Sequence, residues 1–253
     1  MYDAVVSQNK AAWEYRAYEW RVSHQGTPQA VAAKMMGNPQ KSLRYHGAYF
    51  SDAAGKRVAS ICGSDGRRAV ALALLKADAV VFDISEPQKE YAMALAQAAG
   101  VEIGYEIGDF CKTDIARYGA YFDYAYAEGG VLHYFHDLER FFETVYAILK
   151  PNGALLLCDF HPFTKIVSAN FTAEVEGEAD YFNSGAINDC VAYKPFFAKD
   201  EQASFPDVSV RRYTISEILN ASIRAGLTIR EFVEHPGWVN PKWPGEFTIV
   251  AAK

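Results

Sequence analysis

The 253-residue sequence lacks the features that mark several specialised classes of protein. Its four cysteines are scattered without a Cys-x-x-Cys pair, so neither a disulfide framework nor a zinc-finger type of site is expected. No run of about 18 apolar residues occurs, which predicts that no segment spans a membrane. The N-terminus has no basic segment followed by a long apolar core, so we expect no secretion signal and a cytoplasmic protein.

Clustered positive charge is also scarce. The formal net charge is −6 at pH 7, and no basic run exceeds a local pair such as Arg67-Arg68. A surface that binds nucleic acid needs many lysines and arginines to contact phosphates. We therefore expect neither nucleic acid nor a membrane among the partners. The sequence leaves open whether the chain is a monomer or a homodimer.

Short apolar runs alternate with helix patterns between residues 55 and 163. This alternation predicts a parallel sheet covered on both faces, which is a doubly wound α/β fold. The expected strands cover residues 58–61, 79–83, 103–107, 122–127 and 154–159, and the expected helices cover 66–76, 86–99 and 137–149.

A glycine-containing turn follows the first expected strand, and an acid ends the second. The turn is Cys62-Gly63-Ser64-Asp65-Gly66, and the acid is Asp83. This layout is typical of a nucleotide-binding α/β unit. Small residues let backbone N–H groups approach a ligand, and the following helix adds positive potential. Because an acid at the tip of the second strand can accept both ribose hydroxyls, we predict an adenosine-containing ligand.

Four segments occur in an order and spacing that resemble a known family. They are the 62–66 turn, Asp83 in Val-Val-Phe-Asp-Ile-Ser, Asp109 in Gly-Asp-Phe, and Leu-Lys-Pro-Asn-Gly at 149–153. Over roughly residues 55–163 the chain resembles class I S-adenosylmethionine-dependent methyltransferases. The resemblance implies a mostly parallel, seven-stranded Rossmann-like sheet and the cofactor S-adenosyl-L-methionine, with S-adenosyl-L-homocysteine as its product. It also implies methyl transfer to O, N, S or activated C of a small-molecule acceptor.

The turn departs from the family pattern. The family usually has an acid at the end of the first strand and a Gly-x-Gly-x-Gly turn. Here Ser60 stands in place of the acid, and Cys62 and Ser64 stand in place of the first two glycines. Both are small enough for a close backbone approach, although less free than glycine. Another residue must then hold the methionine ammonium, and our candidate is Glu128, in the Glu-Gly-Gly segment after the fourth strand.

The predicted cofactor contacts come from the strand ends and the N-terminal helices. Asp83 is expected to bind the ribose, and Asp109 with Phe110 to bracket the adenine. Aromatic residues of the helical prefix, which the resemblance makes a lid, are additional candidates. The full set is Trp13, Tyr45, Cys62, Gly63, Ser64, Gly66, Asp83, Ile84, Asp109, Phe110, Glu128 and Gly129.

Two histidines are candidates for a general base. His161 lies two residues after Asp159, and side chains two apart on an extended segment point to the same face. His133 follows the fourth strand, and capping or packing is its alternative role. The alternative for His161 is a structural role in which it holds the turn at Pro162. Together with His136 and Asp159, these two histidines could be read as metal ligands, but no pair has the spacing typical of zinc ligands, such as His-x3-5-His, so we predict no metal site.

Four units are expected along the chain: a helical lid over 1–54, a cofactor-binding core over 55–163, a substrate-side insertion over 164–207, and a segment over 208–253 that completes the core sheet. The insertion, with runs such as 190–193, is expected to hold loops and short antiparallel strands. The last unit is expected to hold a helix at 214–225 and strands at 227–233 and 246–252.

Two other functions stay open. One is a protein of this fold that binds S-adenosylmethionine or its product without catalysis. The other is a nicotinamide-dependent oxidoreductase. The oxidoreductase is disfavoured by the Leu-Lys-Pro-Asn-Gly and Gly-Asp-Phe segments and by the absence of a usable Gly-x-Gly-x-x-Gly turn.

Overall fold

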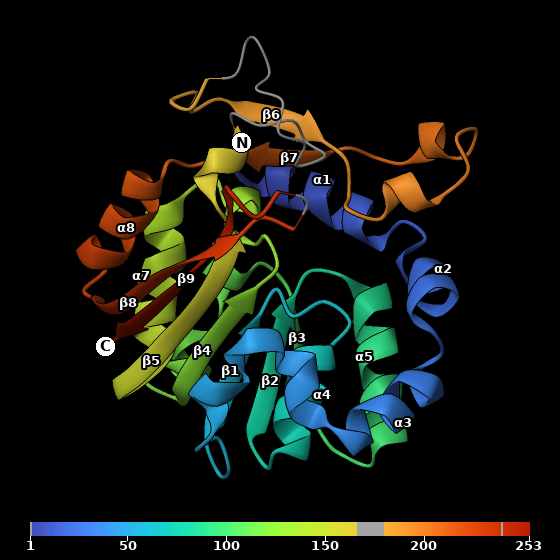
Figure 1. Cartoon of the computed structure of the whole chain (residues 1–253), viewed down its shortest axis with the longest axis horizontal. Helices are drawn as coiled ribbons and strands as arrows, with labels where there is room; N and C mark the ends of the chain where they lie inside the picture. Colours follow the sequence, from blue (N-terminus) through green and yellow to red (C-terminus); the bar gives the residue numbers. More distant parts are fainter. Residues whose placement is uncertain (1, 166–179, 239) are drawn as a thin grey trace.

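A seven-stranded sheet forms the centre of the molecule (Figure 1). The computed structural model describes residues 2–165, 180–238 and 240–253. The strand order is β3-β2-β1-β4-β5-β9-β8, in which β9 runs antiparallel to both neighbours and the other pairs are parallel. The strands are β1 (Arg57–Ile61), β2 (Asp78–Asp83), β3 (Gly104–Ile107), β4 (Phe122–Glu128), β5 (Leu149–Phe160), β8 (Thr228–Pro236) and β9 (Pro244–Ala252). The predicted fold class is confirmed.

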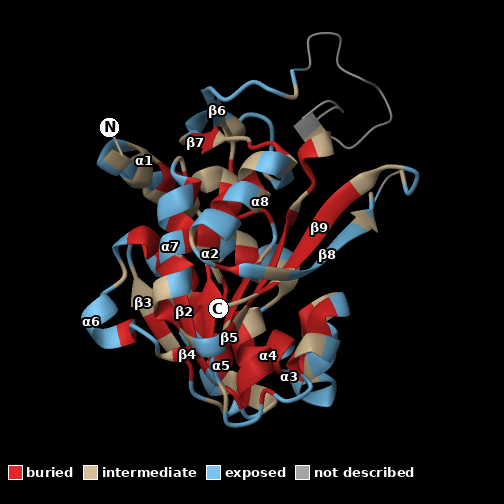
Figure 2. Ribbon diagram, turned by 90° about the vertical axis from the view of Figure 1, so that its left-hand side faces the viewer, coloured by how far each residue is buried: buried red, intermediate tan, exposed pale blue. Residues whose placement is uncertain are grey.

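Helices cover both faces of this sheet (Figure 1). They are α4 (Arg67–Leu74), α5 (Glu86–Ala99), α6 (Ile115–Tyr118), α7 (Leu138–Ile148) and α8 (Ile215–Arg224), with 3-10 turns η3 (Phe110–Lys112), η4 (Leu132–Tyr134) and η5 (Pro162–Lys165). Two hydrophobic clusters form, one containing α7 and α8 and the other α4 and α5. Figure 2 shows the central strands buried, whereas β8 at the sheet edge is largely exposed.

The N-terminal 54 residues, expected as one lid, divide into two parts. Helix α1 (Tyr2–Glu14) runs above the carboxyl ends of the strands, and α2 (Ala17–Trp20) and the π-helix η1 (Arg21–Gln25) continue from it down the side of the core beside α5 (Figure 1). We call residues 2–25 the roof. Helix α3 (Pro28–Gly37) and the 3-10 segment η2 (Pro39–Phe50) instead bury Val31, Leu43 and Phe50 in the cluster around α4 and α5. This second part therefore belongs to the core.

A small antiparallel sheet lies on the roof. Strand β6 (Ala186–Asp189) pairs with β7 (Val208–Arg211), and Figure 1 shows both above α1. The 190–193 run is not a strand; it leads into 3-10 turns η6 (Lys194–Phe196) and η7 (Gln202–Ser204). Expected insertion residues 166–179 lie outside the described residues. Because β7 pairs with β6, residues 208–211 belong with the insertion, and the strands that complete the core sheet begin at Thr228.

The roof is tied to this small sheet by side chains. Asn9 Nδ2 donates to the Ser209 carbonyl oxygen at 3.0 Å, and the Ser209 N–H donates to Asn9 Oδ1 at 2.7 Å. The Tyr193 hydroxyl donates to the carbonyl oxygens of Ala12 and Tyr15. Asn9 and Tyr193 are buried, so the roof and the insertion form one packed layer. None of the helices in the described part of the chain is long and apolar enough to cross a membrane.

Candidate active site at the carboxyl ends of the strands

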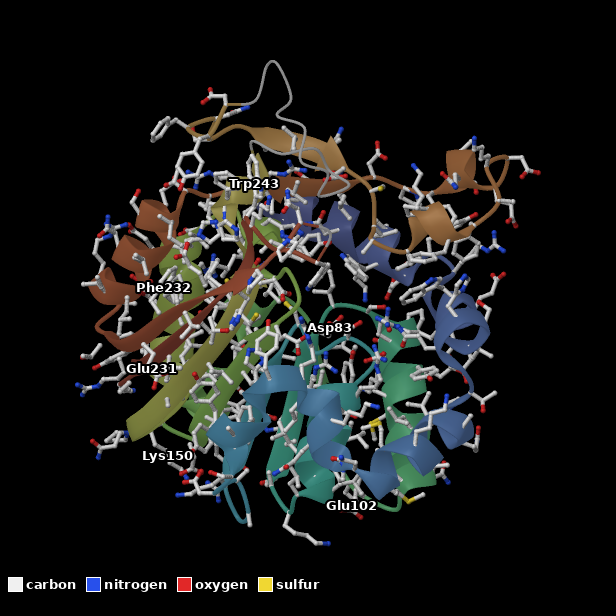
Figure 3. The ribbon with its side chains drawn as sticks, in the orientation of Figure 1. Asp83, Glu102, Lys150, Glu231, Phe232 and Trp243 are labelled. Carbon is white, nitrogen blue, oxygen red and sulfur yellow. The ribbon has the colours of Figure 1, made fainter. Side chains whose placement is uncertain are left out.

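A cavity of about 280 Å³ lies between the sheet and the roof. Figure 3 shows Asp83 at the carboxyl end of β2, below α1. Parallel α/β sheets bind ligands outside the carboxyl ends of their strands, which is where this cavity opens. Its walls from the core include Ser60, Ile61, Cys62, Gly63, Ser64, Asp65, Arg67, Arg68, Phe82, Asp83, Ile84, Gly108, Asp109, Phe110, Tyr126, Glu128, Gly129, Gly130, Val131, Tyr134 and Phe135, and those from the roof are Tyr2, Val6, Asn9, Trp13 and Arg21.

The 62–66 turn keeps the backbone of a glycine-rich turn. Cys62 and Ser64 have φ values of 48° and 49°, in the left-handed region where a residue with a Cβ costs roughly 1–2 kcal/mol. Gly63 and Gly66 are needed for space. A Cβ on Gly63 would lie 2.6 Å from Ser60 Oγ, and one on Gly66 would lie 2.6 Å from the Ala92 Cβ. The turn thus has glycine at the two positions where packing leaves no room for a side chain. At Cys62 and Ser64 it instead accepts a strained, left-handed backbone.

Asp83 organises this turn. Its Oδ2 accepts from the Ser64 N–H at 2.9 Å and its Oδ1 from the Ser85 N–H at 3.0 Å. Burial raises the pKa of Asp83, and these hydrogen bonds act in the opposite direction. Ser85 itself caps α5 by accepting from the Gln88 N–H. Each Asp83 oxygen still has acceptor capacity for a ligand hydroxyl, because a carboxylate offers about four lone-pair positions.

Asp109 presents a buried oxygen that lacks a donor. Its Oδ1 accepts from the Tyr2 hydroxyl at 3.1 Å and from the Cys111 N–H at 3.0 Å. Its Oδ2 has no hydrogen-bond partner within the described residues. A buried unpaired acceptor costs about 1–3 kcal/mol. Phe110 lies beside it with its ring centroid 5.8 Å from that of Phe82. This corner therefore suits a flat group that donates a hydrogen bond.

Glu128 is already saturated. Its carboxylate accepts from Arg68 Nε and Nη2, from Arg44 Nη1 at 3.3 Å and from the Tyr126 hydroxyl at 2.9 Å. Burial raises its pKa, but Arg68, Tyr126 and Arg44 together outweigh burial and hold the pKa at about 2. Arg44 also reaches Glu246 at 2.9 Å, so these charges form one network. An ammonium at Glu128 would have to displace one of these donors.

Asp65 is a second acid in the cavity wall, and the sequence reasoning missed it. It is only 5% exposed, and its Oδ2 lies 3.1 Å from Arg21 Nη1 and 2.8 Å from Arg67 Nε. Arg21 and Arg67 help to lower its pKa although burial raises it. Its Oδ2 makes no hydrogen bond of good geometry within the described residues. The sequence could have indicated it, because Asp65 is an acid within the 62–66 turn that was expected to contact the ligand.

Comparison with known proteins agrees with this architecture. Residues 58–153 match a family model described as a methyltransferase domain. This match assigns residues 58–153 to a methyltransferase domain, and the strand order of the sheet agrees with the class I, S-adenosylmethionine-dependent type. No curated protein sequence matches the chain.

Solved structures share the fold of this methyltransferase. A Mesorhizobium loti S-adenosylmethionine-dependent methyltransferase has 23% identity and a TM-score of 0.61, with 81% of this chain and 94% of that chain covered. A Listeria monocytogenes protein assigned as an S-adenosylmethionine-dependent methyltransferase has 16% identity and a TM-score of 0.64, with coverages of 84% and 97%. These two structures show the fold. The methyltransferase-domain match at residues 58–153 is what makes the chain an enzyme of this class, with S-adenosylmethionine as its cofactor.

Most of the predicted cofactor contacts line the cavity of the methyltransferase. Gly66 and Tyr45 do not. Gly66 lies against Ala92 of α5, where it lets that helix pack close to the turn. Tyr45 donates its hydroxyl to Glu246 at 2.8 Å and also contacts Cys158. Tyr45 therefore supports the network behind Glu128, and it does not reach the cavity wall.

The two predicted catalytic histidines also lie outside the cavity lining. His161 Nδ1 accepts from the Phe163 N–H at 3.0 Å, and Nε2 lies 3.0 Å from Glu234 Oε1. His133 stacks on Phe160 with centroids 6.1 Å apart, and burial lowers its pKa to about 4. The contacts of His161 match its structural alternative, in which it holds the turn at 162–163. A base role stays the untested alternative for both histidines.

Asp159, expected on the same face as His161, shapes a loop. Its Oδ2 accepts from the N–H groups of Val131 and Leu132, both at 2.8 Å, and burial raises its pKa to about 6. The same loop places Tyr134 in the cavity wall. No group of three or more His, Cys, Asp or Glu within the described residues is arranged to hold a metal ion.

Proposed function

We propose that the cavity holds S-adenosylmethionine, with the adenine at Asp109 and Phe110 and the ribose on Asp83. The observation that carries this assignment is the buried Asp109 Oδ2, which lacks a donor within the described residues. An exocyclic adenine amine would supply that donor. Asp83, at the neighbouring strand end, offers two carboxylate oxygens that the N–H groups of Ser64 and Ser85 hold in place.

The methionine end of the cofactor then falls among charged residues. The cavity wall there includes Arg67 and the acids Asp65 and Glu128. Because Glu128 already accepts four hydrogen bonds, we assign the ammonium to Asp65 and the carboxylate to the Arg67 guanidinium. In this assignment Asp65 takes the place of the acid that the family usually has at the position of Ser60. Glu128 in turn holds the Arg68 guanidinium in the same part of the cavity wall, beside the cofactor carboxylate.

We further propose that the acceptor is a small molecule. When bound, the cofactor supplies an electrophilic methyl group for in-line displacement. The protein must hold the acceptor in line and exclude water. Trp13 and Tyr134 enclose the cavity, with ring centroids 5.7 Å apart, and the roof above them is pinned to β7 through Asn9. A covered site of this kind admits a small acceptor more readily than a folded macromolecule.

Two measurements test this function. Calorimetry should show binding of S-adenosylmethionine and S-adenosylhomocysteine, and no binding of NAD. Release of S-adenosylhomocysteine should then be followed with panels of small O, N and S nucleophiles, with an unstructured peptide and RNA as controls. Turnover confined to small molecules supports the proposal. Turnover on the peptide or RNA contradicts the small acceptor, and absence of S-adenosylmethionine binding contradicts the cavity assignment.

A further inference from the structure

Ser64 connects three parts of the molecule at the cavity wall. Its N–H donates to Asp83, and its carbonyl oxygen accepts from the Tyr105 hydroxyl at 2.8 Å. Its side-chain oxygen accepts from Arg21 Nη2 at 2.7 Å. The residue therefore joins the proposed ribose-binding acid, strand β3 and the roof. A glycine would adopt the φ of 49° more easily, but it would offer Arg21 no hydroxyl.

Arg21 reaches from the roof into the core. Its side chain is 8% exposed, and it begins η1 at the end of the roof helices. Besides Ser64, its guanidinium contacts Gln88 Oε1 of α5 at 3.0 Å and Asp65 Oδ2 at 3.1 Å. The Trp20 ring stacks on one face of the guanidinium, with its centroid 4.5 Å from Arg21 Cζ. A buried guanidinium with three acceptors resists removal, because each acceptor would lose a charged donor.

We propose that Arg21 is a positioning residue that couples closure of the roof to the binding conformation of the 62–66 turn. The hydrogen bond from Arg21 to the Ser64 side chain is the contact that links the two. The inference rests on the proposed function, in which the cavity holds S-adenosylmethionine. When the roof is closed, Arg21 fixes the Ser64 side chain, and the Ser64 N–H in turn orients Asp83. When the roof opens, the turn loses this support.

A competing role for Arg21 is direct contact with the cofactor carboxylate, since Arg21 also lines the cavity. The two roles differ in how Arg21 depends on Ser64. If Arg21 acts through Ser64, removing both side chains has little more effect than removing either one. If Arg21 contacts the cofactor by itself, or acts on it through Asp65, the two effects multiply. A double-mutant cycle separates these cases.

The test compares Arg21→Gln, Ser64→Gly and the double variant in the full chain. Arg117→Gln is the matched control, because Arg117 is an exposed arginine paired with Glu106. Calorimetry with S-adenosylhomocysteine should show about tenfold weaker binding in each single variant, as expected for one lost charged hydrogen bond. The double variant should be at most about twofold weaker again. Hydrogen exchange of residues 2–20 without ligand should be about tenfold faster in all three and unchanged in the control.

Several results would overturn the proposal. One is a roughly hundredfold loss of binding in the double variant, and another is unchanged binding in Ser64→Gly. A wild-type chain that does not bind S-adenosylhomocysteine refutes the proposed function instead; the ligand-free exchange experiment then still decides whether Arg21 and Ser64 hold the roof. Should Arg21→Gln fail to fold, Arg21→Lys replaces it. Hydrogen exchange of residues 2–20 at the wild-type rate in both Arg21→Lys and Ser64→Gly would then count against the coupling.

Discussion

Removing the Asp83 carboxylate should weaken cofactor binding far more than it disturbs the fold. In Asp83→Ala the ribose loses its charged acceptor. One hydrogen bond to a charged group contributes about 1.5–3 kcal/mol, which corresponds to roughly 10- to 150-fold in Kd. We therefore expect both S-adenosylmethionine and S-adenosylhomocysteine to bind at least about tenfold more weakly. The effect should be similar for the two ligands because they share the ribose.

The variant has a second effect that the assay must separate. Alanine also leaves the N–H groups of Ser64 and Ser85 without their acceptor. Asp83→Asn keeps an amide oxygen for one of them and removes the charge. The matched control is Asp123→Asn, because Asp123 accepts from the Arg57 N–H and from Lys150 at the amino end of the central strand β4, away from the cavity. The control should bind the cofactor like the wild type.

Calorimetry at one pH, with thermal unfolding of each variant, provides the decisive comparison. The expected result is weak binding by both Asp83 variants, while the Asp123 variant loses stability only. Equal binding by the wild type and Asp83→Ala would refute the ribose role. Weak binding by Asp83→Ala with normal binding by Asp83→Asn would show that Asp83 acts by shaping the turn.

The other expected outcomes concern the roof, His161 and pH. Deleting residues 1–25, but not α3, should leave a folded chain that binds S-adenosylhomocysteine at least about tenfold more weakly; unchanged calorimetric affinity would show that the roof only packs on the outside. His161→Gln should lower Tm by a few degrees and keep turnover within about twofold, whereas a loss of about 10²-fold at constant cofactor affinity would identify the base. Burial lowers the pKa of His46 to about 4. In the unfolded chain this histidine therefore takes up a proton from about pH 6.5 downward, and His46 alone should lower the free energy of unfolding by roughly 3 kcal/mol toward pH 4. His46→Gln should flatten this slope in urea titrations, and an unchanged slope would assign it to other groups.

The core of the fold was predictable because local signals agree with it. Helix α5 runs from Glu86 to Ala99 as expected, since Ser85 caps its start and Gly100, with φ of 68°, ends it. Strands β1 to β4 start and end close to their apolar runs, whereas β5 begins at Leu149 and includes residues 150–153, which the sequence indicated as a turn before a strand at 154–159. The prefix was harder, because both of its parts look helical in sequence. Only packing distinguishes α3, whose Val31 and Met35 are buried, from the roof.

The site was predictable where one strand end determines it. Asp83 ends β2 and Asp109 follows the end of β3 by two residues, so both line the cavity, because these parallel strands have their carboxyl ends side by side. Roles that depend on partners distant in sequence were not predictable. Glu128 is saturated by Arg44 and Arg68, which lie 84 and 60 residues earlier in the chain. Similarly, the acceptor nitrogen of His161 is occupied by the Phe163 N–H, which no periodicity reveals.

The paired hydrogen bonds between Asn9 and Ser209 also bear on how such enzymes can be recombined. The Asn9 side chain makes the two bonds that a neighbouring strand would make with Ser209, and so α1 protects that edge of β7. The first helix and the residues around 186–211 are therefore one exchangeable module although they stand at distant places in the gene. A chimera that takes this insertion from another enzyme must take the matching first helix as well, or it will expose an uncapped strand edge.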